Sequence, residues 1–308
     1  MSAAIRLEKL SEENLPAAHA LFVETFGPRI SLEDFRKKYD TSYCGVRHIC
    51  YLAYDRQQPV AFYGALPGRF EYKGERFLAV QACDSITREA YRGKGIHHQL
   101  ANATYEEMAK HGLSFVFALH SAATYGATKN LGWELGAQML RFHLPVRSLP
   151  LARIARKLKW NVIAKRAERF FAPHTVKKSE LKNPLCAEGA IAYRYDEAFF
   201  GYKSYTPNRV LRFGDALFWI KLRSVLEIGA AGECGDKALA EGLQELKKLC
   251  AKIGVNEIQL HATPGSRLAE QLKKNYPALP SWPIGFRNFS CRFPMEQLKF
   301  NPGDLDTF

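Results

Sequence analysis

Residues 91–100 read YRGKGIHHQL and place two glycines around a lysine where a strand is expected to lead into a long helix. Glycine lets the backbone turn tightly and approach a ligand closely. The first N–H groups of a helix have no internal partner, and the helix dipole favours an anion there. The amides of this turn are therefore suited to hold a pyrophosphate, with Arg92 and Lys94 adding positive charge.

The turn does not match the commonest phosphate-binding patterns. No GxxxxGK[ST] is present, and GxGxxG fails because His98 stands where the third glycine would fall. Taken alone, the stretch is equally consistent with a strand-to-helix turn that carries solvated cations.

Other catalytic patterns find little support in the sequence. It contains no HExxH, no paired-carboxylate metal site and no GxSxG, so no metal site or hydrolase is predicted. The seven cysteines are odd in number, scattered and without a CxxC, which argues against a disulfide framework and a structural zinc site. His120 and His261 each end a predicted buried strand, where a satisfied core histidine is the ordinary interpretation.

The elements that must position the turn follow from hydrophobic periodicity. IRLEK predicts a strand, Ser11 followed by Glu12 and Glu13 predicts a helix start, and Ser31 predicts a second one. Three strands come next, then a helix from Ile96 to His111, and then a short apolar strand, a short helix and a last strand. The order β-α-α-β-β-β-α-β-α-β predicts an α/β sandwich around a mixed sheet.

In this context the turn resembles that of the GNAT superfamily of acyl-CoA-dependent acyltransferases. The resemblance covers roughly residues 4–145 in element order, and the most specific match runs from about residue 77 to 134, ending with Leu-Gly-Trp. The resemblance implies a GNAT fold and a binding turn formed by Arg92, Gly93, Lys94, Gly95, Ile96, His97 and His98. His97 departs from the family, which prefers a small residue at that position.

The resemblance also implies where the rest of the cofactor lies. In the family the pantetheine arm pairs with the end of the strand before the turn, which maps onto Ser85, Ile86 and Thr87. The strand after the helix splays from it and opens a V for the thioester, and Ser121 matches a position that contacts the cofactor in many relatives.

Tyr125 and Asp84 are the catalytic candidates. The family commonly has a tyrosine, which protonates the departing thiolate, where this chain has Thr128; Tyr125 lies one helical turn earlier on a similar face. Asp84 is the best-placed carboxylate for a base, and its alternative is a structural aspartate bonded to backbone. Some tandem relatives use a terminal carboxylate, here that of Phe308.

The second half of the chain partly repeats the first. KHGLSFVFALH resembles KIGVNEIQLH, and a short helix follows each. We therefore expect two related GNAT-like domains in tandem, at 1–145 and 183–308, against the alternative of two unrelated units. The second has no Arg-Gly-x-Gly, and Glu233 and Asp236 at its helix start would repel a pyrophosphate, which predicts a degenerate copy.

The segment between them, residues 146–182, is strongly basic. From residue 145 to 182 there are eleven Lys or Arg and two Glu, which gives a net +9 of the chain's +13. Residues 149–171 predict a basic amphipathic helix, either a linker with a solvated face or a contact for an anionic membrane, an acyl-carrier protein or an acidic substrate. Nucleic acid ranks last, because aromatic residues are few there (Trp160, Phe170 and Phe171).

Composition and the N-terminus predict a cytoplasmic protein. The chain has 308 residues, 47% hydrophobic and 24% charged, and no apolar run approaches the roughly 18 residues of a membrane span. Arg6, Glu8 and Lys9 interrupt any signal-peptide core.

Three functions remain open from the sequence. The favoured one is an N-acetyltransferase that moves an acetyl group from acetyl-CoA to an amine on a small molecule or a protein. The second uses a longer acyl chain, on CoA or on an acyl-carrier protein. The third is a catalytically inactive tandem module that binds an anionic partner or membrane. The acceptor and the oligomeric state are not predicted.

Overall fold

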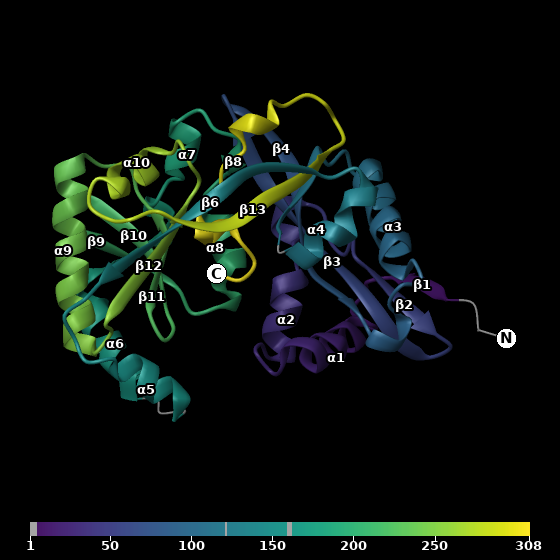
Figure 1. The fold of residues 1–308 in the computed structure, drawn as a ribbon, viewed down its shortest axis with the longest axis horizontal. Coiled ribbons are helices and arrows are strands. Elements are labelled where there is room, and N and C mark those ends of the chain that lie inside the picture. Colours follow the sequence, from purple (N-terminus) through teal and green to yellow (C-terminus); the bar gives the residue numbers. More distant parts are fainter. Residues whose placement is uncertain (1–4, 121, 159–161) are drawn as a thin grey trace. The chain divides into compact units, whose positions relative to one another are not determined.

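The computed structural model describes residues 5–120, 122–158 and 162–308. The chain forms two compact units, neither of which is contiguous in sequence (Figure 1). Unit 1 contains residues 1–70, 75–136 and 283–295, and unit 2 contains residues 71–74, 137–282 and 296–308.

Unit 1 has the predicted α/β sandwich around a mixed sheet. Its elements are β1 (Arg6–Lys9), α1 (Leu15–Phe26), α2 (Leu32–Tyr39), β2 (Tyr51–Asp55), β3 (Gln58–Tyr72), β4 (Glu75–Thr87), α3 (Ile96–Lys110), β5 (Phe115–Leu119), α4 (Ala122–Thr128) and the C-terminal part of β13 (Leu279–Asn288). The strand order is β1-β2-β3-β4-β5-β13. β4 and β5 run parallel, whereas β13 is antiparallel to β5.

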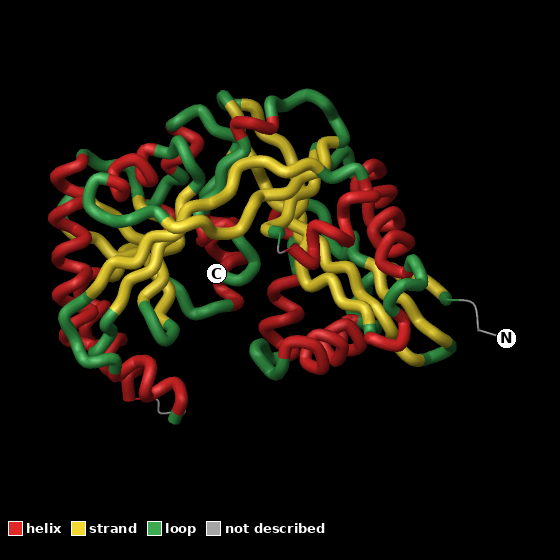
Figure 2. Tube along the Cα trace, in the orientation of Figure 1, coloured by secondary structure: helices red, strands yellow, loops and turns green. Residues whose placement is uncertain are grey.

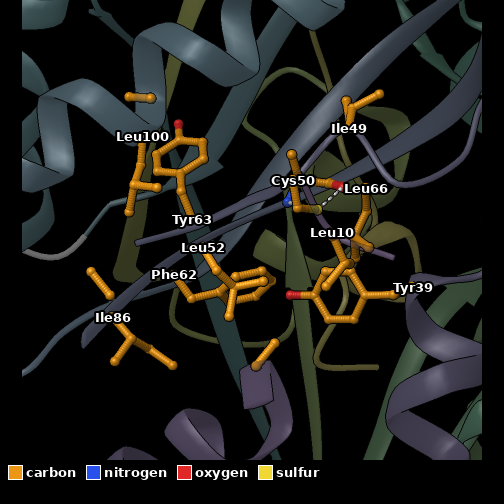
Figure 3. Close-up of a cluster of buried hydrophobic side chains, with 14 of the residues drawn as sticks. Leu10, Tyr39, Ile49, Cys50, Leu52, Phe62, Tyr63, Leu66, Ile86 and Leu100 are labelled. Atoms are coloured by element: carbon orange, nitrogen blue, oxygen red, sulfur yellow. Dashed lines mark hydrogen bonds between the residues drawn. The ribbon is translucent and has the colours of Figure 1, made fainter. Parts of the chain in front are cut away.

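The helices of unit 1 cover both faces of this sheet (Figure 2). Successive side chains of a strand point to opposite faces, and β3 shows this at two adjacent aromatic residues. Phe62 packs on Tyr39 of α2, with ring centroids 5.5 Å apart, whereas Tyr63 packs on Tyr105 of α3 at 6.2 Å. Figure 3 shows Tyr63 beside Leu100 of α3 in this core.

The predicted start of the first helix is wrong, and that of the second is confirmed. α1 begins at Leu15, so Glu12 and Glu13 precede it. A helix capped at Ser11 would place Pro16 after its first turn, where proline removes a helical hydrogen bond and clashes with the carbonyl of the preceding turn. Ser31 caps α2 as expected and accepts a hydrogen bond from the backbone N–H of Asp34 at 3.0 Å.

Unit 2 is also built on a sheet with helices. Its elements are most of β6 (Glu134–Pro145), α5 (Leu151–Lys157), α6 (Val162–Phe171), β7 (Thr175–Val176), α7 (Pro184–Ala187), β8 (Ala192–Tyr193), α8 (Glu197–Tyr202), β9 (Arg209–Phe213), β10 (Ala216–Leu222), β11 (Leu226–Ala231), α9 (Asp236–Ile253), β12 (Glu257–Ala262), α10 (Arg267–Lys273) and the start of β13. The strand order is β6-β12-β11-β10-β9-β7.

The two units exchange their last strands, so the linear boundaries at 145 and 183 do not coincide with the compact units. β6 follows α4 of unit 1 in sequence, but most of it pairs with β12 of unit 2. β13 follows α10 of unit 2, but its C-terminal part pairs with β5 of unit 1. A strand pairs with the edge that matches its register and side chains, and sequence order does not fix that choice.

Both units also share an element order of three strands, a helix, a strand and a short helix, and the strands flanking the long helix are parallel in each. This order agrees with the expected duplication, which stays a prediction.

The basic segment forms two described helices, α5 and α6, where a single helix over 149–171 was predicted. Trp160, which belonged to that prediction, lies outside the described residues. Among the helices that the structure describes, none is long and apolar enough to cross a membrane.

Candidate functional site

The parallel strands β4 and β5 part near the middle of unit 1. Their pairing joins Val80 to Val116 and Gln81 to Phe117, and within the described residues it goes no further, although β4 continues to Thr87. Asp84 has a left-handed backbone at φ 45°, which is rare for a residue other than glycine. The gap predicted between these strands therefore opens where β4 is irregular.

Asp84 is held in place from the α2 side of the sheet. Its Oδ2 accepts hydrogen bonds from Lys38 Nζ at 2.6 Å and from the Tyr39 hydroxyl at 2.7 Å. Cys83 Sγ also lies 3.8 Å from that hydroxyl, so two consecutive residues of β4 face the same side, as in a β-bulge. Gly64 of β3 makes room, because an added Cβ would lie 2.3 Å from the Tyr39 oxygen.

These contacts favour a structural role for Asp84, which was a candidate base. Lys38 is buried, with 5% of its side chain exposed, and Asp84 is largely covered, with 9% exposed. The carboxylate is bonded to side chains of α2, where the sequence suggested backbone. Since two buried donors already occupy it, Asp84 is better placed to fix the bend in β4 than to accept a proton from a substrate.

The turn between β4 and α3 has the backbone that a phosphate cradle requires. Gly93 and Gly95 both have left-handed φ angles, 73° and 74°, and Gly95 precedes the first residue of α3. The first amide with an internal acceptor is that of Gln99, which donates to the Gly95 carbonyl at 3.1 Å. Within the described chain, the amides from Gly93 to His98 have no backbone acceptor. They form a row of unpaired donors at a helix start.

The side chains of Arg92 and Lys94 each contact a neighbouring residue of unit 1. Arg92 Nε donates to the Thr87 carbonyl at 3.2 Å and so ties the turn back to the end of β4. Lys94 Nζ lies 4.8 Å from the centre of the Tyr91 ring, and the Tyr91 hydroxyl donates to Asp55 at 2.7 Å. Two cations thus flank the row of amides and remain exposed.

His97, the residue that departs from the family pattern, directs its ring into unit 1. The ring lies 5.4 Å from that of Tyr63, and burial lowers the pKa of His97, which keeps it neutral. Its amide stays in the row of unpaired donors. Ile96 is buried in the core beneath the turn, and His98 packs edge-on to His97 at 6.0 Å.

A row of buried polar side chains, which the sequence did not predict, runs from this turn beneath α3. The Tyr63 and Tyr105 hydroxyls lie 3.2 Å apart, and Trp133 Nε1 donates to the Tyr105 hydroxyl at 2.7 Å. Burial raises the pKa of Tyr63 and Tyr105. These three residues are distant in sequence, so no local sequence pattern predicts their contacts.

This row of side chains continues from Trp133 to His120, which directly follows β5. The His120 ring lies 5.1 Å from Trp133 and 6.1 Å from Tyr125 of α4. His120 is only 1% exposed, yet neither ring nitrogen has a hydrogen-bond partner within the described residues. Burial lowers its pKa, so the imidazole is neutral. The expected core histidine is found, but it is not a satisfied one.

Tyr125 and Thr128 have different surroundings on α4. Tyr125 is partly exposed, whereas Thr128 is buried and its hydroxyl donates to the Thr124 and Tyr125 carbonyls, each at 3.2 Å. The Thr128 hydroxyl hydrogen is therefore engaged by the backbone, whereas the Tyr125 ring lies near that of His120.

The remaining predicted residues lie at the end of β4. Ser85 is exposed, Ile86 is buried in the core of unit 1, and Thr87 is partly buried. Ser121 lies outside the described residues. Unit 1 thus has the glycine turn tied to the end of β4, and His120 beside Tyr125, with Trp133, Tyr105 and Tyr63 lying between His120 and His97.

The start of α9 in unit 2 also has amides without a backbone acceptor, from Glu233 to Ala238 in the described chain. It differs from the glycine turn of unit 1 in its backbone, since Gly235 before the helix has φ −66°, and in its acidic side chains. Asp236 in the first turn of α9 pairs with Lys274, which directly follows α10, at 2.7 Å and accepts from Gln271, and the bond to Lys274 lowers the pKa of Asp236. Glu233 lies 3.7 Å from Arg267. The acids that were predicted to repel a phosphate occupy this helix start.

Comparison with protein families gives a match for unit 1. Residues 6–136 match the model described as the acetyltransferase (GNAT) domain. No curated protein matches the sequence.

Solved structures resemble nearly the whole chain in fold. A GCN5-related N-acetyltransferase from Kribbella flavida is 15% identical with a TM-score of 0.63, over 94% of this chain and 72% of that one. N-myristoyltransferase from Saccharomyces cerevisiae, solved with myristoyl-CoA and inhibitors, is 12% identical with a TM-score of 0.61, over 99% and 84%. Eis1 from Mycobacterium abscessus is 11% identical with a TM-score of 0.54, over 92% and 73%. At these identities the likeness shows the GNAT fold.

Proposed function

We propose that the protein is an N-acetyltransferase that moves an acetyl group from acetyl-CoA to an amine. The observation that carries the proposal is the row of unpaired amides from Gly93 to His98, flanked by Arg92 and Lys94, in a domain that matches the GNAT family. These donors suit the pyrophosphate of coenzyme A, and the open edge of β4 beyond Gln81 suits the amides of its pantetheine arm.

The chemistry needs two proton transfers. The neutral amine attacks the thioester carbon, the carbon–sulfur bond breaks, and the acyl group stays on nitrogen. Tyr125 gives its proton to the departing thiolate, and the nitrogen loses one proton. His120 is neutral, unpartnered and next to Tyr125, so it is the candidate to receive that proton. Asp84 holds the bend of β4 and takes no proton in this scheme.

Calorimetry with acetyl-CoA tests the binding step through the glycine turn. Gly95→Glu places a side chain and a negative charge beside the row of amides, and we expect it to abolish measurable binding. Gly112→Glu is the matched control, because Gly112 also has a left-handed φ, 63°, with open space around it, just beyond the opposite end of α3. The proposal fails if the wild type does not bind, or if Gly95→Glu binds as tightly as Gly112→Glu.

The same experiment separates the other two functions. Tighter binding of myristoyl-CoA than of acetyl-CoA would favour a longer acyl donor, as in the yeast neighbour solved with that ligand. Binding without transfer to any member of a panel of amines, including polyamines, amino sugars and peptides, would favour an inactive module.

A further inference from the structure

A patch of exposed apolar side chains lies on the basic segment of unit 2. Leu149, Leu151, Ile154 and Leu158 are exposed by 71%, 37%, 45% and 51%. Few other large hydrophobic residues of the described chain are as exposed, and those few do not form another run in sequence. Such a concentration on a water-soluble surface marks a contact site.

The patch is a stripe along α5. At about 100° per residue, Leu151, Ile154 and Leu158 fall within an arc of about 60°. Ala152 and Ala155, beside this arc, are the buried residues of α5, and Leu151 at the edge of the stripe also lies against Gly254. Leu149, Ile154 and Leu158 are therefore the part of the patch that is most exposed to solvent.

Cations lie beside the stripe on α5 and along α6 of the same basic segment. Arg153, Arg156 and Lys157 occupy the remaining face of α5, and the exposed side chains of α6 add Lys165, Arg166 and Arg169. One of these cations is paired within unit 2, since Arg153 forms an ion pair with Glu257. Arg169 lies in the last turn of α6. In Figure 1, α5 and α6 lie together at one end of unit 2.

We propose that this surface, residues 147–158 with the exposed face of α6, binds the headgroup region of an anionic lipid bilayer. A helix with an apolar stripe and flanking cations lies in that interface, with its apolar side chains among the acyl chains and its cations at the anionic headgroups. An acidic carrier protein would satisfy the cations but leave the apolar stripe in water. Lipid accounts for both features.

Vesicle co-sedimentation of the full chain tests this. We expect the wild type to pellet with phosphatidylcholine vesicles that contain about 30% phosphatidylserine and to stay in solution with pure phosphatidylcholine. We expect the double variant Ile154→Ser with Leu158→Ser to lower the partition coefficient about tenfold or more. Leu279→Ser is its matched control, an exposed leucine elsewhere in unit 2 that is expected to leave binding unchanged.

Charge is tested in parallel. We expect Lys157→Glu with Lys165→Glu to weaken binding, and the exposed pair Lys237→Glu with Lys273→Glu to have little effect. Wild type that stays in solution with the anionic vesicles overturns the proposal. So does a serine variant that binds like the wild type while the charge variant does not, because that outcome indicates an electrostatic partner such as an acidic protein. No acyl-CoA is present, so the result is independent of the transferase activity.

Discussion

His120 has an environment that the sequence did not predict. A histidine at the end of an apolar strand suggests a bonded core residue, yet both of its nitrogens are buried without a described partner. An orphaned buried polar group costs about 1–3 kcal/mol, so a protein gains stability by replacing it unless it has another use. Its ring lies 6.1 Å from that of Tyr125, and the proton-acceptor role that we propose for His120 would be such a use.

At Tyr125 and His120, we expect single substitutions to lower turnover without weakening the binding of acetyl-CoA. Tyr125→Phe removes the acid and His120→Gln removes the candidate base, and each is expected to reduce kcat about 10²-fold or more. Steady-state kinetics and calorimetry on the same preparations separate the two effects. Thr128→Val is the control, since its hydroxyl bonds only the backbone of its own helix. Full activity of both variants would remove the proposed roles.

At the scale of elements, the strand and helix order of unit 1 could be predicted, because hydrophobic periodicity and turn residues are local signals. The bend of β4 could not. Asp84 adopts a left-handed backbone without being glycine, and Lys38 and Tyr39 hold it from a helix that lies far away in sequence. The start of α1 was missed for a local reason, the position of Pro16.

We expect Asp84→Asn to destabilise unit 1 by about 3–5 kcal/mol, because it removes the carboxylate that accepts hydrogen bonds from the buried Lys38 ammonium and the Tyr39 hydroxyl. Replacing the pair together, Lys38→Met with Asp84→Asn, is expected to recover much of that loss. Chemical denaturation measures both. If Asp84 were instead a base, Asp84→Asn would reduce kcat with an unchanged melting temperature, and the double variant would rescue nothing.

At the scale of the whole molecule, a buried carboxyl in unit 2 makes stability depend on pH. Asp304 is 3% exposed, accepts from the Tyr195 hydroxyl at 2.6 Å and from the Asn301 amide at 2.7 Å, and burial raises its pKa to about 7. Between the ordinary aspartate pKa near 4 and this value, the folded state holds a proton that the unfolded state has lost. This contribution to stability is complete below about pH 4 and is lost as pH rises through 7.

Thermal unfolding of wild type and Asp304→Asn from pH 5 to 8 measures the effect. We expect the wild type to lose stability relative to the variant as pH rises from 5 toward 7, by up to about 1.4 kcal/mol per pH unit, and the difference to level off between pH 7 and 8. Buried His97, His120 and His261 act in the opposite direction, because burial lowers their pKa, but they are common to both proteins. Asp236→Asn serves as the control, since the pKa of Asp236 is lowered and lies below the window. Parallel curves for wild type and Asp304→Asn would contradict the assignment.

The exchange of β6 and β13 sets the order in which the protein can be completed during synthesis. β5 leaves the ribosome long before β13, so the nascent first half waits with an open sheet edge until nearly all of the chain has been made. An open edge of this kind invites pairing with other chains, and contacts between distant segments slow folding. The two units therefore complete their folding together. If the chain is cut after residue 145, each half lacks a strand that the other half contains.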